Sequence, residues 1–150
     1  TGERPLLLVD SEAEVAPGIS PWTHLKNCDR WERPVGATEE QVHLMVQCME
    51  NWFLAEREKL AKFYNKGFHA ASLPATRPIE NARKEDVLNG LAQAARHTKR
   101  GGYSKGGHAF FILEHLNPHR VSQQAPWACR LFKTLEKWLK LPEKMECVSP

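Results

Sequence analysis

The stretch that decides the fold is Leu6-Leu7-Leu8-Val9, a short apolar run that Asp10-Ser11-Glu12 follows directly. A run that is apolar on both faces predicts a strand buried inside a parallel sheet. The segment Val42–Gln47 (VHLMVQ) predicts a second strand. Independent sheets usually hold three or more strands, and a doubly buried strand needs a neighbour on each side. We therefore expect a partial sheet, with an upstream strand absent from this chain.

Helical patterns dominate the rest of the chain. Ala16–Gly36 is rich in proline and glycine and is expected to be mostly loop, with one helical turn at Trp22–Lys26 that Ser20 caps. Longer helices are predicted at Glu50–Tyr64, Lys84–Arg96, His108–Leu116 and Ala125–Leu141. Strands followed by helices indicate an α/β fold, here a partial parallel sheet with flanking helices and a helical C-terminal half. We expect a single domain over residues 1–150.

Composition excludes several classes of protein. The 150 residues are 41% hydrophobic and 26% charged, with a net charge of +3, which are ordinary values for a globular protein. No apolar run approaches the roughly 20 residues that span a bilayer, so we expect no membrane segment. The four cysteines (Cys28, Cys48, Cys129, Cys147) show no CxxC pair or regular spacing. This scatter favours reduced thiols in a cytoplasmic protein over a disulfide framework.

Three carboxylates are candidates for a metal site. Asp10 and Glu12 end the first predicted strand, and Glu50 follows the second. The carboxyl ends of parallel strands meet at one edge of a sheet, and acids gathered there favour a hard cation such as Mg²⁺ or Mn²⁺. The alternatives are that Asp10 and Glu12 merely end a strand, and that Glu50 lies in a first helical turn where the helix dipole favours an acid.

A basic, glycine-rich segment, Lys99–His108, precedes a predicted helix. Exposed backbone N–H groups, a helix N-terminus and nearby cations together suit phosphate binding. The segment is not a Walker loop, because Gly107 stands where the lysine should be. The alternative is a solvated loop without a ligand. The candidate phosphate-binding residues are Lys99, Arg100, Gly101, Gly102 and Lys105.

With these residues in view, the sequence resembles a bacterial family, the domain of unknown function 4276. The resemblance rests on LLLVDSEAEV (Leu6–Val15), PWTHL (Pro21–Leu25), HLMVQCMENWFLA (His43–Ala55), SLP (Ser72–Pro74) and GGYSKGGHA (Gly101–Ala109). That family looks related to TOPRIM-like nucleases of phage-defence systems, which are often encoded beside an ATPase. The relation implies a TOPRIM-like sheet, an upstream glutamate at a strand end and a later D-x-D motif. Asp10 and Glu12 match the D-x-D positions, whereas nothing here matches the upstream motif.

The resemblance implies a Mg²⁺- or Mn²⁺-dependent nuclease of a defence system. The residues themselves suggest the roles: Asp10 and Glu12, together with Glu50, would hold the metal, and Lys105 or His108 would contact the scissile phosphate of a nucleic acid. Without the upstream glutamate, we expect this chain alone to be catalytically incomplete. The alternative is a non-catalytic module that docks on an ATPase or binds a phosphorylated ligand. A second copy of the chain is a further possible partner, because it could cover the strand Leu6–Val9.

Overall fold

The computed structural model describes residues 2–147 of the chain. Both predicted strands are present, as β1 (Leu7–Asp10) and β2 (Val42–Met45). They pair in parallel, with Leu7 opposite Val42 and Asp10 opposite Met45. The pairing continues past the strands, since the Ser11 N–H donates to the Met45 carbonyl at 3.0 Å. The described part of the chain is thus mixed α/β with a two-stranded parallel sheet.

The two strands differ in burial. In β2, Val42 and Leu44 are fully buried, whereas all four residues of β1 are only half-buried. Strand β1 is therefore a half-exposed edge strand, as expected for a strand that lacks a second neighbour, and is not buried on both faces. Among residues 2–147, β1 pairs with β2 on one edge and with no strand on the other. The side chains of a second neighbouring strand, which would help to bury those of β1, are therefore absent from the described residues. This edge position agrees with the expectation of a partial sheet.

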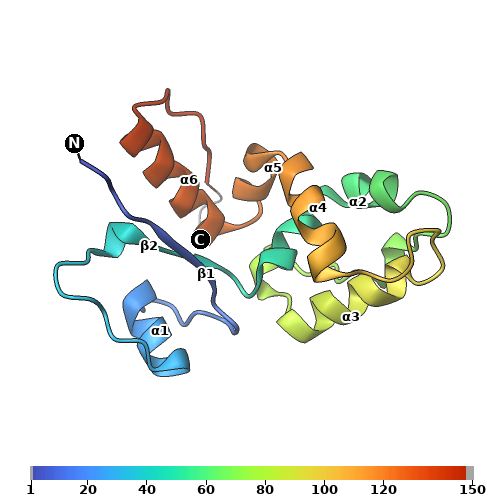
Figure 1. Ribbon diagram of the computed structural model, residues 1–150, viewed down its shortest axis with the longest axis horizontal. Coiled ribbons are helices and arrows are strands. Elements are labelled where there is room, and N and C mark those ends of the chain that lie inside the picture. Colours follow the sequence, from blue (N-terminus) through green and yellow to red (C-terminus); the bar gives the residue numbers. More distant parts are fainter. Residues whose placement is uncertain (1, 148–150) are drawn as a thin grey trace.

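The described residues form six α-helices, which are, in chain order, α1 (Pro21–Asp29), α2 (Arg57–Tyr64), α3 (Lys84–Ala95), α4 (Phe110–His115), α5 (Pro118–Ser122) and α6 (Pro126–Leu139). Figure 1 shows the strands between α1 and α6, with α2, α3 and α4 gathered at the other end of the molecule. The predicted Ser20 cap is confirmed, because its hydroxyl accepts from the Thr23 N–H. Helix α3 agrees with its predicted range to within one residue. None of the described helices is both long and apolar enough to cross a membrane.

The segment between β2 and α2 departs from the prediction. Met49–Glu56 is a 3₁₀ segment, η2, and the α-helix begins only at Arg57, so the prediction of one helix from Glu50 to Tyr64 is wrong in its first half. Every residue of η2 is buried. Because apolar residues occur on all sides of the segment, their spacing does not distinguish an α-helix from a 3₁₀ segment. The side-chain amide of Asn51 donates to two carbonyls near Ile79–Asn81, both at 2.9 Å, and holds the segment in the core.

The core has two parts. A small cluster lies between the sheet and α1, around Trp22, Leu25 and Leu44. A larger one joins η2 to the other helices, and its fully buried members include Phe53 and Leu91. The 3₁₀ segment η2 belongs to this larger core while directly following β2. It therefore fixes the position of Glu50 relative to the end of the sheet.

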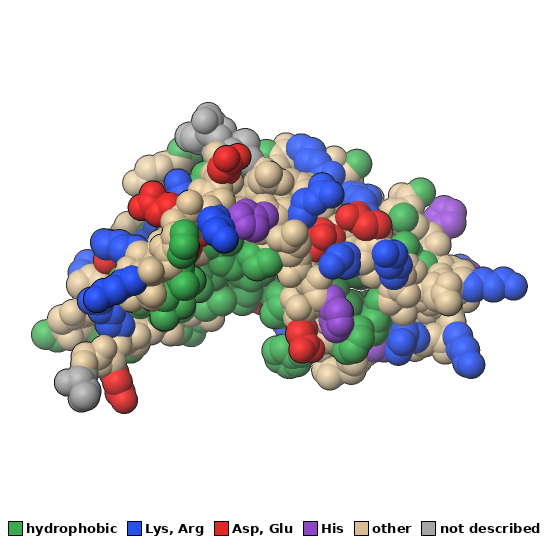
Figure 2. Space-filling model, turned by 90° about the horizontal axis from the view of Figure 1, so that it is seen from above, with side chains coloured by type: hydrophobic (Ala, Val, Ile, Leu, Met, Phe, Trp, Pro, Cys, Tyr) green, Lys and Arg blue, Asp and Glu red, His purple; other side chains and the backbone are tan. Residues whose placement is uncertain are grey.

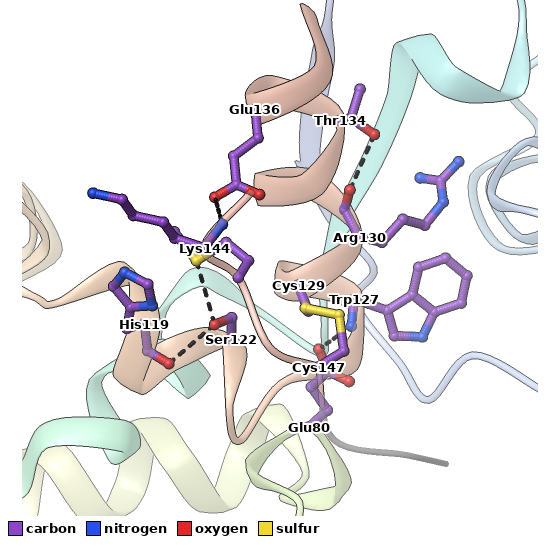
Figure 3. Close-up of a disulfide and its surroundings, with 11 residues drawn as sticks. Glu80, His119, Ser122, Trp127, Cys129, Arg130, Thr134, Glu136, Lys144 and Cys147 are labelled. Atoms are coloured by element: carbon purple, nitrogen blue, oxygen red, sulfur yellow. Dashed lines mark hydrogen bonds between the residues drawn. A yellow bond between two sulfur atoms is a disulfide. The ribbon is translucent and has the colours of Figure 1, made fainter. Parts of the chain in front are cut away.

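A disulfide joins Cys129 of α6 to Cys147, with Cα atoms 5.6 Å apart (Figure 3). The prediction of four reduced thiols is therefore wrong for this pair, whereas Cys28 and Cys48 are free. The chain after α6 turns back along the helix, and the Lys144 N–H donates to the Glu136 carboxylate at 3.0 Å. That return brings the two cysteines together. Their separation of 18 residues in the sequence does not by itself predict a disulfide.

Candidate functional site

Asp10 and Glu50 come together at the carboxyl end of the sheet. Asp10 is the last residue of β1, and Glu50 is the second residue of η2, just beyond β2. The Met49 N–H donates to Asp10 Oδ1 at 2.8 Å and fixes that carboxylate. Lys105 Nζ lies 3.6 Å from Asp10 Oδ2 and 3.8 Å from Glu50 Oε1. Three of the residues singled out in the sequence thus form one cluster, the carboxylate–lysine site.

Glu50 is the buried member of this site. Its side chain is 1% exposed, and the Tyr103 hydroxyl donates to Oε1 at 2.7 Å. Its other oxygen, Oε2, is buried and has no hydrogen-bond partner among the described residues. Buried polar atoms are almost always satisfied, and an orphaned one calls for a proton, a water or an ion. Oxygen atoms of neighbouring carboxylates are a type of ligand that hard divalent cations accept.

Burial and charge both act on the neighbours of Glu50. Burial raises the pKa of the Asp10 carboxyl, and the Glu50 charge adds to this, while the Met49 N–H and Lys105 oppose it. Burial, followed by the charge of Glu50, raises the pKa of the Cys48 thiol to about 12. A thiol with such a pKa is not a nucleophile at neutral pH. The chemistry of this site therefore rests on its carboxylates and its lysine.

Glu12 lies outside the carboxylate–lysine site. Its φ is +63°, and its carboxylate forms an ion pair with Lys84 at the start of α3. Within residues 2–147, no group of three or more His, Cys, Asp or Glu side chains is placed to hold a metal. Mg²⁺ is commonly held by one or two carboxylates, with waters and substrate phosphates in its other positions. The pair Asp10 and Glu50 fits that pattern.

The glycine-rich loop ends in a π-helical turn, Lys105–Ala109, that leads into α4. His108 is oriented there on one side, because its Nδ1 accepts from the Ser104 N–H at 3.3 Å and lies 3.1 Å from the Tyr64 hydroxyl. The Ser104 N–H can only donate, so Nδ1 is an acceptor and Nε2 carries the ring proton. The His108 side chain can therefore offer an N–H to a ligand.

The predicted phosphate loop divides in two. Lys105 joins the carboxylate–lysine site, whereas Lys99 and Arg100 line a separate cavity with the end of α2. Gly101 has a φ of +78°, and a Cβ on Gly101 or Gly102 would meet no atom within 4 Å. Gly101 therefore allows the left-handed backbone conformation of the loop, and the space beside the backbone at both glycines is open.

Two tyrosines were missed in the sequence. Tyr103 binds Glu50, and Tyr64 binds His108, so both hydroxyls orient predicted site residues. Tyr64 lay in a helical pattern that predicted only core packing. Tyr103 lies two residues before Lys105, inside the loop already singled out, and this proximity was the one available signal.

One comparison with known proteins gave a match. A family model described as domain of unknown function (DUF4276) matches residues 1–136. No curated protein and no solved structure matches the chain. The matched range includes both strands, the carboxylate–lysine site and most of α6. The chain therefore belongs to the DUF4276 family.

Proposed function

We propose that the carboxylate–lysine site hydrolyses phosphodiester bonds of a nucleic acid with the help of Mg²⁺ or Mn²⁺. The observation that supports this most is the bare, buried Oε2 of Glu50 beside the second carboxylate of Asp10. The ammonium of Lys105 lies 3.6 Å and 3.8 Å from the two carboxylates. Lys84, which also acts on Asp10, is itself paired with Glu12. A divalent cation would complete the balance, and substrate phosphates would fill its remaining positions.

The residues of the site have distinct parts in this proposal. Asp10 and Glu50 hold the cation, which when bound polarises a phosphoryl oxygen and makes a water more acidic. Lys105 lies beyond hydrogen-bond distance of both carboxylates, and its side chain is 61% exposed. It is thus free to reach a phosphate oxygen and stabilise the charge that develops there. His108 offers its Nε2 proton to the same phosphate group.

Glu12 is not a metal ligand in the conformation that the structure shows, because its carboxylate is paired with Lys84. It would reach the cation only after leaving Lys84. The TOPRIM-like relation, the role in antiviral defence and the ATPase partner rest on the family resemblance. That resemblance also implies a glutamate on a strand beside β1, which would supply a third carboxylate. We therefore expect weak activity from the two carboxylates of this chain alone.

A second candidate function is a phosphate-binding module without catalysis, which would dock on an ATPase. The ion pair between Glu12 and Lys84 favours it, because that pair withholds the third expected ligand. The separate basic cavity lined by Lys99 and Arg100 also favours it. Such a module would bind nucleic acid or a phosphorylated ligand with no need for a cation.

Cleavage of labelled DNA and RNA with millimolar Mn²⁺ separates the two functions. The proposal predicts that the protein cleaves these substrates, that Asp10→Asn abolishes the cleavage and that EDTA suppresses it. Asp29→Asn is the matched control, because Asp29 is an exposed aspartate at the end of α1. Nucleic-acid binding without cleavage in the parent protein would reject the nuclease and leave the binding module.

A further inference from the structure

A row of aromatic rings lies between α2 and α4, half-buried at Phe63 and exposed at Phe111 and His115. The Phe63 ring lies 5.1 Å from the Phe111 ring, and the Phe111 ring stacks on His115 at 4.4 Å. At the other end of the row, the Arg100 guanidinium lies over Phe63 at 4.4 Å. Phe111 is 51% exposed, although an aromatic ring of this size is normally covered. The exposed rings of the row are therefore those of Phe111 and His115, whereas Phe63 is half-buried beneath the Arg100 guanidinium.

Cations surround this row. A cavity of about 840 Å³ beside Phe63 is lined by four lysine or arginine side chains, at Lys62, Lys66, Lys99 and Arg100. Among the described residues, no Asp or Glu lines it. Figure 2 shows Lys and Arg side chains spread over the part of the molecule where α2 and α4 lie. The cavity beside Phe63 therefore attracts an anion.

The backbone beneath this surface is fixed. Gly67 follows α2 with a φ of +91°, and a Cβ there would overlap the carbonyl oxygen of His97 just after α3. The His69 N–H donates to the Ala94 carbonyl at 2.9 Å, and Arg100 Nε donates to the Phe63 carbonyl at 2.8 Å. These contacts join the ends of α2 and α3 with the loop after α3. The Arg100 side chain, and the backbone that carries the other cations, are therefore fixed before a ligand arrives, which lowers the entropy cost of binding.

We infer that this aromatic–basic surface binds single-stranded nucleic acid. Exposed rings among cations are how proteins bind unpaired strands, because bases stack on the rings while lysines and arginines contact the phosphates. A duplex keeps its base faces stacked inside, so the exposed ring of Phe111 would favour the single strand. The Phe63 ring also lies 5.4 Å from the His108 ring. A nucleic-acid strand that passes from Phe111 along Phe63 would therefore reach His108 and then Lys105. In that respect the inference rests on the proposed function and names its substrate class.

Binding without a metal tests the inference apart from catalysis. We would measure the fluorescence anisotropy of a labelled single-stranded oligonucleotide and of a duplex of equal length, with EDTA present. We expect tighter binding of the single strand, and we expect Phe111→Ala to weaken it about fivefold or more. The matched control is Phe110→Ala, because Phe110 is 73% exposed but has no ring partner among the described residues.

A charge-reversed pair tests the basic part of the surface. Lys62→Glu should weaken binding and reduce its salt dependence. Lys133→Glu on α6 makes the same change of charge far from the row and should have the smaller effect. Equal or tighter binding of the duplex would overturn the inference, as would equal effects of Phe111→Ala and Phe110→Ala. Single-strand binding that follows these expectations without any cleavage by the parent protein would support the inference and reject the proposed nuclease.

Discussion

Glu80 is a buried acid whose ionisation should destabilise the fold. Its Oε1 accepts from the Trp127 N–H at 2.9 Å, at the start of α6. Burial raises the pKa of this carboxyl from 4.5 to about 7, against the opposing effect of backbone hydrogen bonds from Trp127 and Ala128. Replacement by glutamine keeps an acceptor oxygen for the helix and removes the charge. Glu80→Gln should therefore stabilise the protein wherever Glu80 is ionised.

The pH range follows from the two pKa values. Below pH 4.5 the carboxyl is protonated in the folded and the unfolded chain, so its charge costs nothing. Between pH 4.5 and about 7 the folded state binds the proton more tightly, and stability falls as pH rises. Above pH 7 the cost is complete, at about 3 kcal/mol by linkage. The variant should thus gain up to about 3 kcal/mol over the parent at pH 8 and little at pH 4.5.

Urea denaturation at a series of pH values measures this difference. The free energy of unfolding of Glu80→Gln minus that of the parent should rise across the interval from pH 4.5 to 7. Glu114→Gln, at an exposed position of α4, controls for the loss of one negative charge. A difference that stays flat with pH, or that falls as pH rises, would refute the reasoning from burial.

Two further predictions concern stability. Gly67→Ala should lower the free energy of unfolding, measured by urea denaturation, by about 1–3 kcal/mol, because φ is +91° and the added Cβ overlaps the backbone of His97. Gly101→Ala should lower it less, because the added Cβ meets open space although φ is +78°. An equal cost at both positions would contradict the close approach beneath Gly67. Replacing Cys129 and Cys147 by serine should lower the free energy of unfolding by about 3 kcal/mol, given the loop that their disulfide closes. Unchanged stability would show that the disulfide does not constrain the unfolded chain.

Local patterns predicted the elements that build the site. The apolar run before Asp10 and the pattern at Val42–Gln47 gave two parallel strands, and their order implied that Asp10 and Glu50 share one edge. The Gly-rich loop was singled out for its charges, and Lys105 does meet those carboxylates. These successes share one cause, because each depends on residues close in sequence or on the geometry of parallel strands.

The features that could not be predicted are contacts between residues far apart in the sequence. Glu12 pairs with Lys84, 72 residues away, so no pattern around Glu12 shows that it leaves the cluster. Tyr103 reaches Glu50 across 53 residues, and the return of the chain along α6 joins Cys129 to Cys147. Such pairings depend on how whole elements pack. A single sequence contains little information about them.

Binding of Mn²⁺ to Asp10 tests the central claim most directly. Electron paramagnetic resonance of free Mn²⁺ gives the Kd without any need for turnover. We expect Asp10→Asn to weaken binding about tenfold or more, since one of two charged ligands is lost. Asp29→Asn, which removes an exposed aspartate of α1, should bind Mn²⁺ as the parent does. Equal Kd values for the two variants would contradict a cation site formed by Asp10 and Glu50.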